Sequence, residues 1–519
     1  MTFALLAVFA IPTLSVPFVY LAGKKSPKYA AVFISLIALV NIALLLTTVP
    51  TILNSSTHQY IESYTWVTVI STSFTLFSDG ISVSIAIVSL ILILVAAVFS
   101  ISYMAGKKNL PAFYALLCML TVGSVGVFLT SNLILFYFCW ELMLVPAYFI
   151  VGEWGYKDSY KKAFKFFIYT HAGAVFVLLG IGATYIATGT TDMFAAHTAL
   201  LTASPVLVQW ILISLTIGFA VKMAVIPVHM WLPDVYAEAP APMSALLGGV
   251  MISAGAYAML RLSLGMVFPA VGLTFGTTFL HALAIVGVLS AFFGSLVSLV
   301  STDMKRLIAY SSIAHMGYIM FGLSLFPVNA TLGTVVLLIS SIAIAGTVLH
   351  IISHALSKGL LFLTAGGIMQ QTDKRDIRKM GGLASKMPFT AVSSTIAALS
   401  IGGVPPFACF ISEFLIFVGA FQVIKIDSFY IIPTALMLIA TVLSLGYGLR
   451  FISNAFLGQS KNDAGEIIEE VKEEKKTFEV SNYMKLSFAV LVVLIVLVGI
   501  YPTVFLHLIQ TVSFNPQVT

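Results

Sequence analysis

The sequence predicts an all-α polytopic membrane protein with about fourteen transmembrane helices. Only 9% of the 519 residues are charged and 60% are hydrophobic, which leaves too little charge to cover the surface of a soluble protein. Apolar runs of about twenty residues recur along the chain, and a helix needs about that length to cross the hydrocarbon layer. Continuous runs favour helices over the alternating pattern of a membrane barrel.

The apolar runs give the order of the predicted spans. They lie at 3–22, 29–49, 81–104, 110–130, 132–152, 162–188, 206–230, 242–265, 276–300, 305–326, 331–369, 389–421, 430–457 and 483–505. The eleventh and twelfth runs are too long for single straight spans, so we expect breaks or turns outside the membrane in both. The first run has no basic region before it and is followed by lysines, which indicates a retained span and not a signal peptide.

The basic residues indicate the orientation. Nearly all of them fall in alternate connections, around 24–28, 107–108, 157–165, 305–306, 374–386 and 450–485. This asymmetry predicts that these connections are cytoplasmic, that both termini are outside, and that the number of spans is even. Because the basic clusters lie between membrane spans, the net charge of +6 does not indicate nucleic-acid binding.

Two connections have a distinct composition. Segment 50–79 is rich in Ser, Thr and aromatic residues and partly alternates, which predicts a small hairpin on the outer face. Segment 461–479 has seven acidic and four basic residues, which predicts a solvated cytoplasmic helix or loop.

The three cysteines, Cys118, Cys139 and Cys409, all lie inside apolar runs. They are too scattered for a disulfide framework or a metal-cluster motif. We therefore expect no iron–sulfur centre, haem, flavin or other cofactor in this chain.

Four ionisable residues lie deep inside predicted spans: Glu141, Lys222, Lys358 and Glu413. Each costs roughly 2.5–3.5 kcal/mol at the middle of the bilayer. Lys–Glu pairs can lock helices together, but hydroxyl and amide contacts usually serve that purpose. We therefore favour a role for these charges in ion transport.

Prolines lie inside three of the charged spans. Pro146 removes the helical donor of a carbonyl just after Glu141, Pro227 does so just after Lys222, and Pro405 and Pro406 do so upstream of Glu413. Broken backbone at membrane depth is tolerated where protein or internal water covers it. The seventh and twelfth spans are both interrupted by proline, and equivalent helices of a five-helix repeat at these places would run in opposite directions, as in inverted-repeat transporters.

Histidines extend the ionisable set. His350, His354 and Lys358 are spaced four apart and share one face of the eleventh helix. Histidine titrates near neutral pH, so this row favours a proton relay with His315 of the tenth span as companion, although a hydrogen-bonded core histidine is the alternative. A zinc site on the His350–His354 pair lacks a nearby third ligand, so we expect no metal site.

Three further polar residues, His229, Asp234 and Glu238, cluster at the cytoplasmic end of the seventh span. They are suited either to proton uptake or to a structural role, and the sequence favours neither.

Taken together, these segments resemble the antiporter-like subunits of respiratory complex I and its relatives. The resemblance covers roughly residues 80 to 505. It is carried by FCWELMLVPAYFIVGEWG (138–155), VKMAVIPVHMWLPDVYAEAPAPMSALLGG (221–249), DMKRLIAYSSIAHMGYIMFG (303–322), SHALSKGLLFLTAGG (353–367) and GGVPPFACFISEF (402–414).

The resemblance implies fourteen helices with two inverted five-helix repeats and broken helices 7 and 12. On that pattern residues 1–109 form an N-terminal three-helix segment with an outer loop, and 110–265 form the first repeat. Residues 276–457 form the second, inverted repeat, and 458–519 form a charged cytoplasmic loop and a C-terminal helix.

The resemblance also implies roles for individual residues. Glu141, Lys222 and Glu413 match the glutamate of helix 5, the lysine of helix 7 and the glutamate of helix 12, and His315 and His354 match central histidines. A glutamate at the last of these positions looks more like subunit M than subunit L. At Ser253 the family commonly has a lysine, and we hypothesise that Lys358 supplies the central proton carrier instead.

The implied function is proton translocation in an NADH or F420H2:quinone oxidoreductase of the plasma membrane. Other membrane subunits would be the partners and would hold the redox centres, since this chain shows none. We hypothesise that Glu141 and Lys222 form a switchable ion pair that drives a proton inward. The alternatives are a subunit of a multisubunit Na+/H+ antiporter or membrane-bound hydrogenase, and a membrane scaffold without transport.

Overall fold

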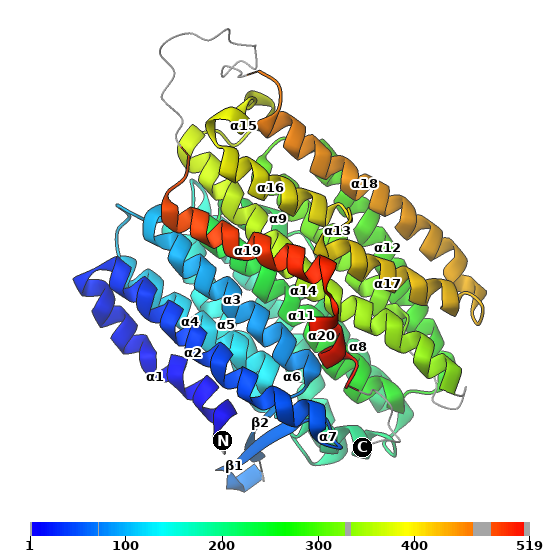
Figure 1. The fold of residues 1–519 in the computed structure, drawn as a ribbon. Helices are drawn as coiled ribbons and strands as arrows, with labels where there is room; N and C mark the ends of the chain where they lie inside the picture. The colour runs from blue at the N-terminus through cyan, green and yellow to red at the C-terminus, as the bar shows by residue number, and fades with distance from the viewer. Residues whose placement is uncertain (1–2, 71, 327–333, 460–478, 513–519) are drawn as a thin grey trace.

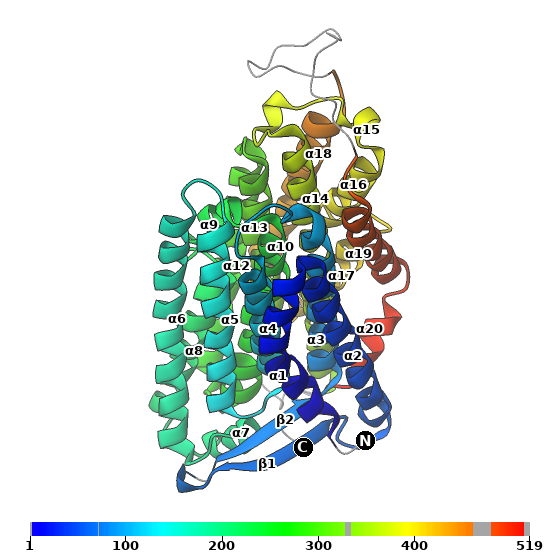
Figure 2. The same ribbon diagram turned by 90° about the vertical axis from the view of Figure 1, so that its left-hand side faces the viewer.

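The structure is a computed structural model that describes residues 3–70, 72–326, 334–459 and 479–512; for 334–341 it describes the backbone alone. The helices run roughly side by side, and the β-hairpin, the start of α1 and the end of α20 all lie at one end of the bundle (Figures 1 and 2). We call this the hairpin face and the opposite end, near α15, the basic face.

The first part of the chain contains three long helices and the hairpin. The elements are α1 (Ala4–Lys25), α2 (Pro27–Asn54), β1 (Tyr60–Val67), β2 (Thr72–Ser78) and α3 (Gly80–Tyr103). The strands are antiparallel, with Tyr60 opposite Ser78, which confirms the hairpin predicted within 50–79.

Glu62 of β1 fastens the hairpin to the first helix. Its buried carboxylate accepts hydrogen bonds from the backbone N–H groups of Leu5 and Leu6, at 3.0 and 2.9 Å. The hydroxyls of Tyr60 and Tyr64 donate to the same carboxylate at 2.9 and 3.0 Å. Glu62 therefore satisfies N–H groups that the start of α1 leaves without helical partners.

The middle of the chain contains the first broken span. Its helices are α4 (Leu110–Leu129), α5 (Leu133–Trp154), α6 (Ser159–Thr188), α7 (Met193–Leu200), α8 (Pro205–Met223) and α9 (Leu232–Glu238). The eighth span follows as α10 (Ala241–Leu246), η2 (Leu247–Met251), α11 (Ile252–Ala258), η3 (Met259–Val267) and η4 (Phe268–Ala270), and η2 and η3 are π-helical.

The last part contains the second broken span. Its elements are α12 (Leu273–Val300), α13 (Met304–Ser324), α14 (Thr334–Thr372), η6 (Ile377–Lys379), α15 (Leu383–Lys386), α16 (Pro388–Ile401), α17 (Ala408–Val423), η7 (Ser428–Tyr430), α18 (Ile431–Phe456), α19 (Asn482–Ile500) and α20 (Thr503–Ile509). Nearly all of the charged segment 461–479 lies outside the described residues.

The predicted number of spans and both proline breaks are confirmed. In the described residues thirteen helices are long and apolar enough to cross a membrane, and the shorter α16 and α17 together make a fourteenth span. The chain leaves the helical path at Ala224, which has a φ of +54°, and at Gly403, which has a φ of +68°. These turns separate α8 from α9 and α16 from α17.

The predicted break in the eleventh span is wrong. Helix α14 is continuous over 39 residues. Its length had suggested an interruption, but it contains no proline to remove a helical donor. At 1.5 Å per residue it extends about 58 Å, so it must tilt or project beyond a hydrocarbon layer of about 30 Å.

Three spans form the interior of the bundle. The segment 241–270, α13 and the part of α14 from Ile342 onward are buried over almost their whole length, whereas α1, α2, α18 and α19 are largely exposed. The central spans therefore lie away from lipid and can carry polar side chains.

Candidate functional site

A cluster of titratable side chains lies where α13, α14, α17 and α18 meet. Nδ1 of His315 lies 3.1 Å from Nε2 of His350, so one imidazole donates a hydrogen bond to the other. The second nitrogen of each ring is held by a hydroxyl: Tyr447 lies 3.0 Å from His315, and Ser412 lies 2.9 Å from His350. These contacts fix the orientation of both rings.

Glu413 of α17 approaches the same pair of histidines. Its Oε1 lies 4.0 Å from Nδ1 of His315 and has no hydrogen-bond partner within the described part of the chain. The break in the twelfth span makes room for this carboxylate, because a Cβ on Gly403 would lie only 2.8 Å from Oε2. The sequence prediction that the break belongs with Glu413 therefore has a direct structural counterpart.

Lys358 extends this cluster along α14 toward the basic face. Its ammonium donates to the hydroxyl of Ser311 and to the carbonyl of Ile308, the latter at 3.3 Å. His354 lies between Lys358 and His350 on the helix, and its ring centre is 5.7 Å from that of His315. Both nitrogens of His354 are buried without a partner among the described atoms. The structure thus brings together the row of residues expected on α14.

The spacing of this cluster also matches that of a three-ligand metal site. One ligand atom each from His315, His350 and Glu413 lies within 4.8 Å of the others. Helical spacing in the sequence pairs His350 with His354, whereas in the fold His350 contacts His315. The direct hydrogen bond between the two imidazoles equally provides a route for proton exchange.

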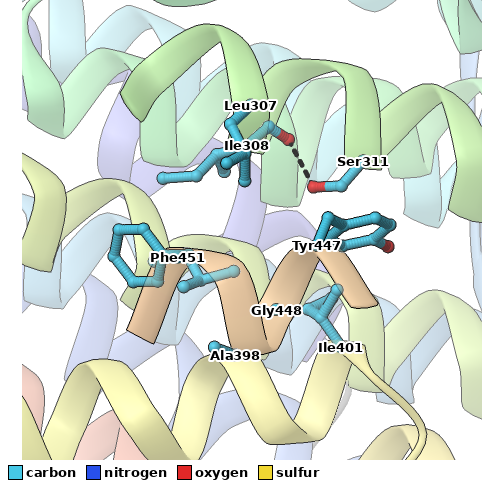
Figure 3. Close-up of a pocket in the computed structure, with 9 residues that line it drawn as sticks. Leu307, Ile308, Ser311, Ala398, Ile401, Tyr447, Gly448 and Phe451 are labelled. Carbon is cyan, nitrogen blue, oxygen red and sulfur yellow. Dashed lines mark hydrogen bonds between the residues drawn. The ribbon is translucent and has the colours of Figure 1, made fainter. Parts of the chain in front are cut away.

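A small apolar cavity adjoins the cluster on the side of α16 and α18 (Figure 3). It offers about 10 Å³ to a water molecule, enough for about one water. Ser311 lines it and donates to the carbonyl of Ile308 at 2.8 Å. The lining residues are Leu307, Ile308, Ser311, Leu361, Ala398, Ile401, Tyr447, Gly448 and Phe451.

Lys222 occupies a second buried position, at the end of α8. Its side chain is 2% exposed, and its ammonium donates to the carbonyl of Trp140 at 3.1 Å and lies 3.8 Å from the centre of the Trp140 ring. It makes no ion pair with Glu141 within 4.0 Å in the described structure. The closed pair that we hypothesised is therefore absent from this conformation.

The side chain of Glu141 points toward α6 and not toward Lys222. Its carboxylate contacts Nδ1 of His171 on α6 at 3.1 Å, and its side chain is 23% exposed at the surface of the chain, so its predicted deep burial is only partial. The reason is geometric: consecutive helical residues point about 100° apart. When Trp140 faces Lys222, Glu141 must face α6.

His229, Asp234 and Glu238, near the basic face, contact different neighbours and do not form one cluster within the described structure. Asp234 binds Lys162, Lys165 and Arg306 at 3.2, 3.0 and 3.0 Å. Glu238 binds Arg375 at 3.2 Å.

His229 lies in the break between α8 and α9. It packs edge-on against Phe293 at 5.0 Å between ring centres, and its Nδ1 has no partner among the described residues. In contrast, the carboxylates of Asp234 and Glu238 tie α9 to its neighbours.

Several contributors to the site were missed at the sequence level. Ser311, Ser412 and Tyr447 are common residue types in membrane helices, and no spacing signal distinguishes them. His171 lies at the centre of the sixth span, and its position inside an apolar run was a usable signal. The sequence places Lys305 in a predicted connection, but it is fully buried in the first turn of α13.

Comparison with known proteins places these features in a family. A family model described as "NADH:quinone oxidoreductase/Mrp antiporter, TM" matches residues 130–441. That range is more than half of the chain and includes both breaks, Glu141, Lys222 and the α13–α14 cluster. The chain belongs to this family.

Individual relatives agree with this assignment. NADH-quinone oxidoreductase subunit M of Pseudomonas aeruginosa is 35% identical over 440 residues, which is 82% of this chain and 80% of that protein. The subunit M of Rickettsia prowazekii is 31% identical and covers 96% of this chain and 95% of its own length.

Solved structures share the fold. A chain of the membrane-bound sulfane sulfur reductase, an archaeal respiratory membrane complex, superposes with a TM-score of 0.82 at 25% identity, covering 98% of this chain and 96% of that chain. A chain of respiratory complex I from Thermus thermophilus superposes with a TM-score of 0.80 at 20% identity, covering 99% and 100%. The fourteen-span architecture with two broken helices is therefore that of the family.

Proposed function

We propose that this chain is the proton-translocating membrane subunit of a complex I-like NADH or F420H2:quinone oxidoreductase. The observation that carries the proposal is the row of enclosed ionisable side chains along α14 and its neighbours, from Lys358 through the histidines to Glu413. Charges at this depth are costly and typically mark ion pathways. The identity to subunit M proteins of NADH-quinone oxidoreductases supports the same role.

The central part of the pathway contains two direct hydrogen bonds, from Lys358 to Ser311 and between His315 and His350. Lys358 releases a proton past Ser311 to His354 and the paired imidazoles of His315 and His350. The 3.1 Å contact between these rings supports direct transfer from one nitrogen to the other. Glu413, whose Oε1 is 4.0 Å from His315, receives the proton next and delivers it toward the hairpin face.

Lys222 is the loading residue of the first half in this proposal. In the observed conformation the carbonyl and ring of Trp140 hold its ammonium. Movement of Glu141 away from His171 toward Lys222 would close the hypothesised ion pair, and its reopening would expel a proton inward. Moving one charge against 100 mV needs roughly 2.3 kcal/mol, which opening a buried ion pair can supply.

Partner subunits complete the proposal. The carboxylate of Glu141 and the ring of His171 lie at the surface of this chain near the middle of their spans. A charge facing lipid at that depth is costly, so we infer that another membrane subunit covers this patch. Electron transfer takes place in partner subunits, and the basic face is cytoplasmic in the plasma membrane, with both termini outside.

The decisive experiment separates pumping from electron transfer in the isolated native complex. We expect Lys358→Ala to abolish proton translocation through this subunit while the complex assembles and still transfers electrons. Adding Ser253→Lys, which restores a lysine where relatives commonly carry it, tests rescue. Lys107→Met, at an exposed lysine of the basic face, is the control. Normal pumping in Lys358→Ala would show that Lys358 is not the central carrier.

The ion-pair step has its own test. Glu141→Gln keeps the size of the side chain but removes its charge, so we expect electron transfer with little pumping. Normal pumping in this variant would defeat the ion-pair step.

Sodium–proton antiport is the competing function, because the family description includes Mrp antiporters. It predicts sodium-dependent proton movement in vesicles without any electron donor. Transport that requires an electron donor and is indifferent to sodium would favour the oxidoreductase.

A further inference from the structure

Lys305 has an environment unlike that of its charged neighbours. It is 0% exposed, and its ammonium donates to the carbonyl of Ala239 at 2.5 Å. No carboxylate lies within 4.0 Å of it in the described part of the chain. By contrast, five other cations of the basic face contact an acidic side chain; they are Lys162, Lys165, Arg306, Arg375 and Arg378. Lys305 is therefore a buried cation without its own counter-ion.

The acceptor of Lys305 belongs to the broken span. Ala239 is the residue that ends α9, and carbonyls at a helix end lack helical donors and carry partial negative charge. The proton on Lys305 is thus held by the end of a short, separate helix and not by an acid. A displacement of α9 would remove this acceptor.

Arg375 is a partly exposed cation beside the buried Lys305. It bonds Asp303 at 2.9 Å, Glu238 at 3.2 Å and the carbonyl of Ala237 at 3.1 Å. Both cations lie over the ring of Tyr156, Arg375 at 5.4 Å and Lys305 at 5.1 Å. Arg375 is 31% exposed. Lys305 therefore lies one layer beneath the aqueous rim, beside a guanidinium that is always charged.

The inner side of Lys305 leads toward Lys358. Lys305 precedes Ile308 by three residues on α13, a rise of about 4.5 Å, and the carbonyl of Ile308 accepts a hydrogen bond from Lys358. Lys305 on α13 and Lys358 on α14 thus lie beside the same stretch of α13. Lys305 is just below the aqueous rim, and Lys358 is within the central cluster. Both are fully buried.

We propose that Lys305 takes up protons at the basic face and passes them to Lys358, which gives the second half of the bundle its own inlet. This inference rests on the proposed function of Lys358. One proton leaves the ammonium of Lys305, crosses on internal water beside α13 and binds the neutral amine of Lys358. Water at the rim then reloads Lys305 when Arg375 releases Glu238 or Asp303, and only N–H and O–H bonds change.

The competing role for Lys305 is a latch that holds the end of α9. Two substitutions distinguish the roles because they keep a donor for Ala239 but cannot cycle a proton. Lys305→Arg keeps the charge permanently, and Lys305→Gln supplies a smaller, neutral amide. The native complex is isolated for each variant, and assembly, quinone reduction and protons moved per electron are measured beside Lys358→Ala and the exposed control Lys107→Met.

We expect both Lys305 variants to assemble and reduce quinone, with a fall in protons per electron as large as that of Lys358→Ala. Wild-type pumping in either variant would overturn the inlet and leave Lys305 as a latch. Failure of both variants to assemble would also count against it, because a structural role would then suffice.

The inlet and the function of the chain can fail separately. If Lys358→Ala stops pumping but the Lys305 variants pump normally, the inlet alone is wrong. If Lys358→Ala also pumps normally, the proposed function of the cluster is wrong.

Discussion

The ammonium of Lys222 binds the backbone carbonyl of Trp140 at 3.1 Å and lies over the indole ring of the same residue at 3.8 Å. Trp140 of α5 thus stabilises the ammonium in two ways, through its backbone carbonyl and through the face of its indole ring. Because the carbonyl survives any substitution, the ring can be tested alone. A desolvated cation–π contact is worth about 2 kcal/mol or more.

We expect Trp140→Leu to lower the rate of proton pumping several-fold without blocking electron transfer, because the protonated form of Lys222 loses part of its support. Trp210→Leu on α8 is the matched control, since that ring is 65% exposed. The measurement is proton translocation against electron transfer in reconstituted complex. Equal pumping in both variants would show that the indole ring does not hold the charge.

Gly403 gives a prediction about the twelfth span. An alanine there meets two obstacles: the left-handed backbone at φ +68° and the carboxylate of Glu413 at 2.8 Å. Gly458 has a similar φ of +74°, but a Cβ at that position would have nothing within 4 Å in the described part of the chain. Both alanines should cost roughly 1–2 kcal/mol in backbone strain, but only Gly403→Ala should displace Glu413 and impair pumping. Impaired pumping in Gly458→Ala would point to strain as the cause.

The buried pair of Arg261 and Asp79 predicts a large effect on stability. Their side chains meet at 2.6 Å and are 9% and 1% exposed, and Asp79 also caps α3 through the N–H groups of Ile81 and Ser82. Arg261→Met should lower the free energy of unfolding by about 3–5 kcal/mol, because it leaves a buried carboxylate without its partner.

Adding Asp79→Asn to Arg261→Met should recover part of this loss, since Asn keeps the helix cap without the charge. Arg378→Met, at a pair whose arginine is 63% exposed, should change the melting temperature little. Thermal unfolding in detergent measures all three variants. If the double variant were less stable than Arg261→Met, the uncompensated charge would not be the cause.

The hairpin predicts a pH effect outside the membrane. Burial and the hydrogen bond to Glu62 raise the pKa of Tyr64 from 10.0 to about 12. A raised pKa means that the protonated phenol stabilises the folded hairpin, fully below pH about 10 and progressively less as the pH approaches about 12. Tyrosinate absorbance of wild type and Tyr64→Phe should differ by a group titrating near pH 12. Glu62→Gln should shift that titration downward, and an unshifted titration would contradict the role of the carboxylate.

Much of the fold could be predicted from the sequence because each span is encoded locally. Apolar length sets the spans, and Pro227, Pro405 and Pro406 mark the two breaks. A missing helical donor alone does not break a span, since α5 is continuous through Pro146. The continuity of α14 could not be predicted from length alone. Length shows that the apolar run is longer than a membrane span, but not whether the extra residues form a break or extend the helix.

The site was predicted less completely, because partners depend on how helices rotate. The sequence contains Lys222 and Glu141, but the 100° turn between Trp140 and Glu141 decides which of them faces the lysine. The contact between His315 and His350 likewise joins two helices whose rotation no spacing rule fixes. Lys305 was misassigned because a basic residue at a span boundary looks the same in sequence whether it faces water or protein.

The unbroken course of α14 constrains how transport can be controlled. A continuous helix fixes the spacing of its backbone, so His350, His354 and Lys358 keep their positions relative to one another along α14. Control must therefore come from the groups that neighbouring helices present to this row, among them Ser311 and Ser412. Ser412 lies on α17 of the interrupted twelfth span, so a small shift of that helix would make or break its contact with His350.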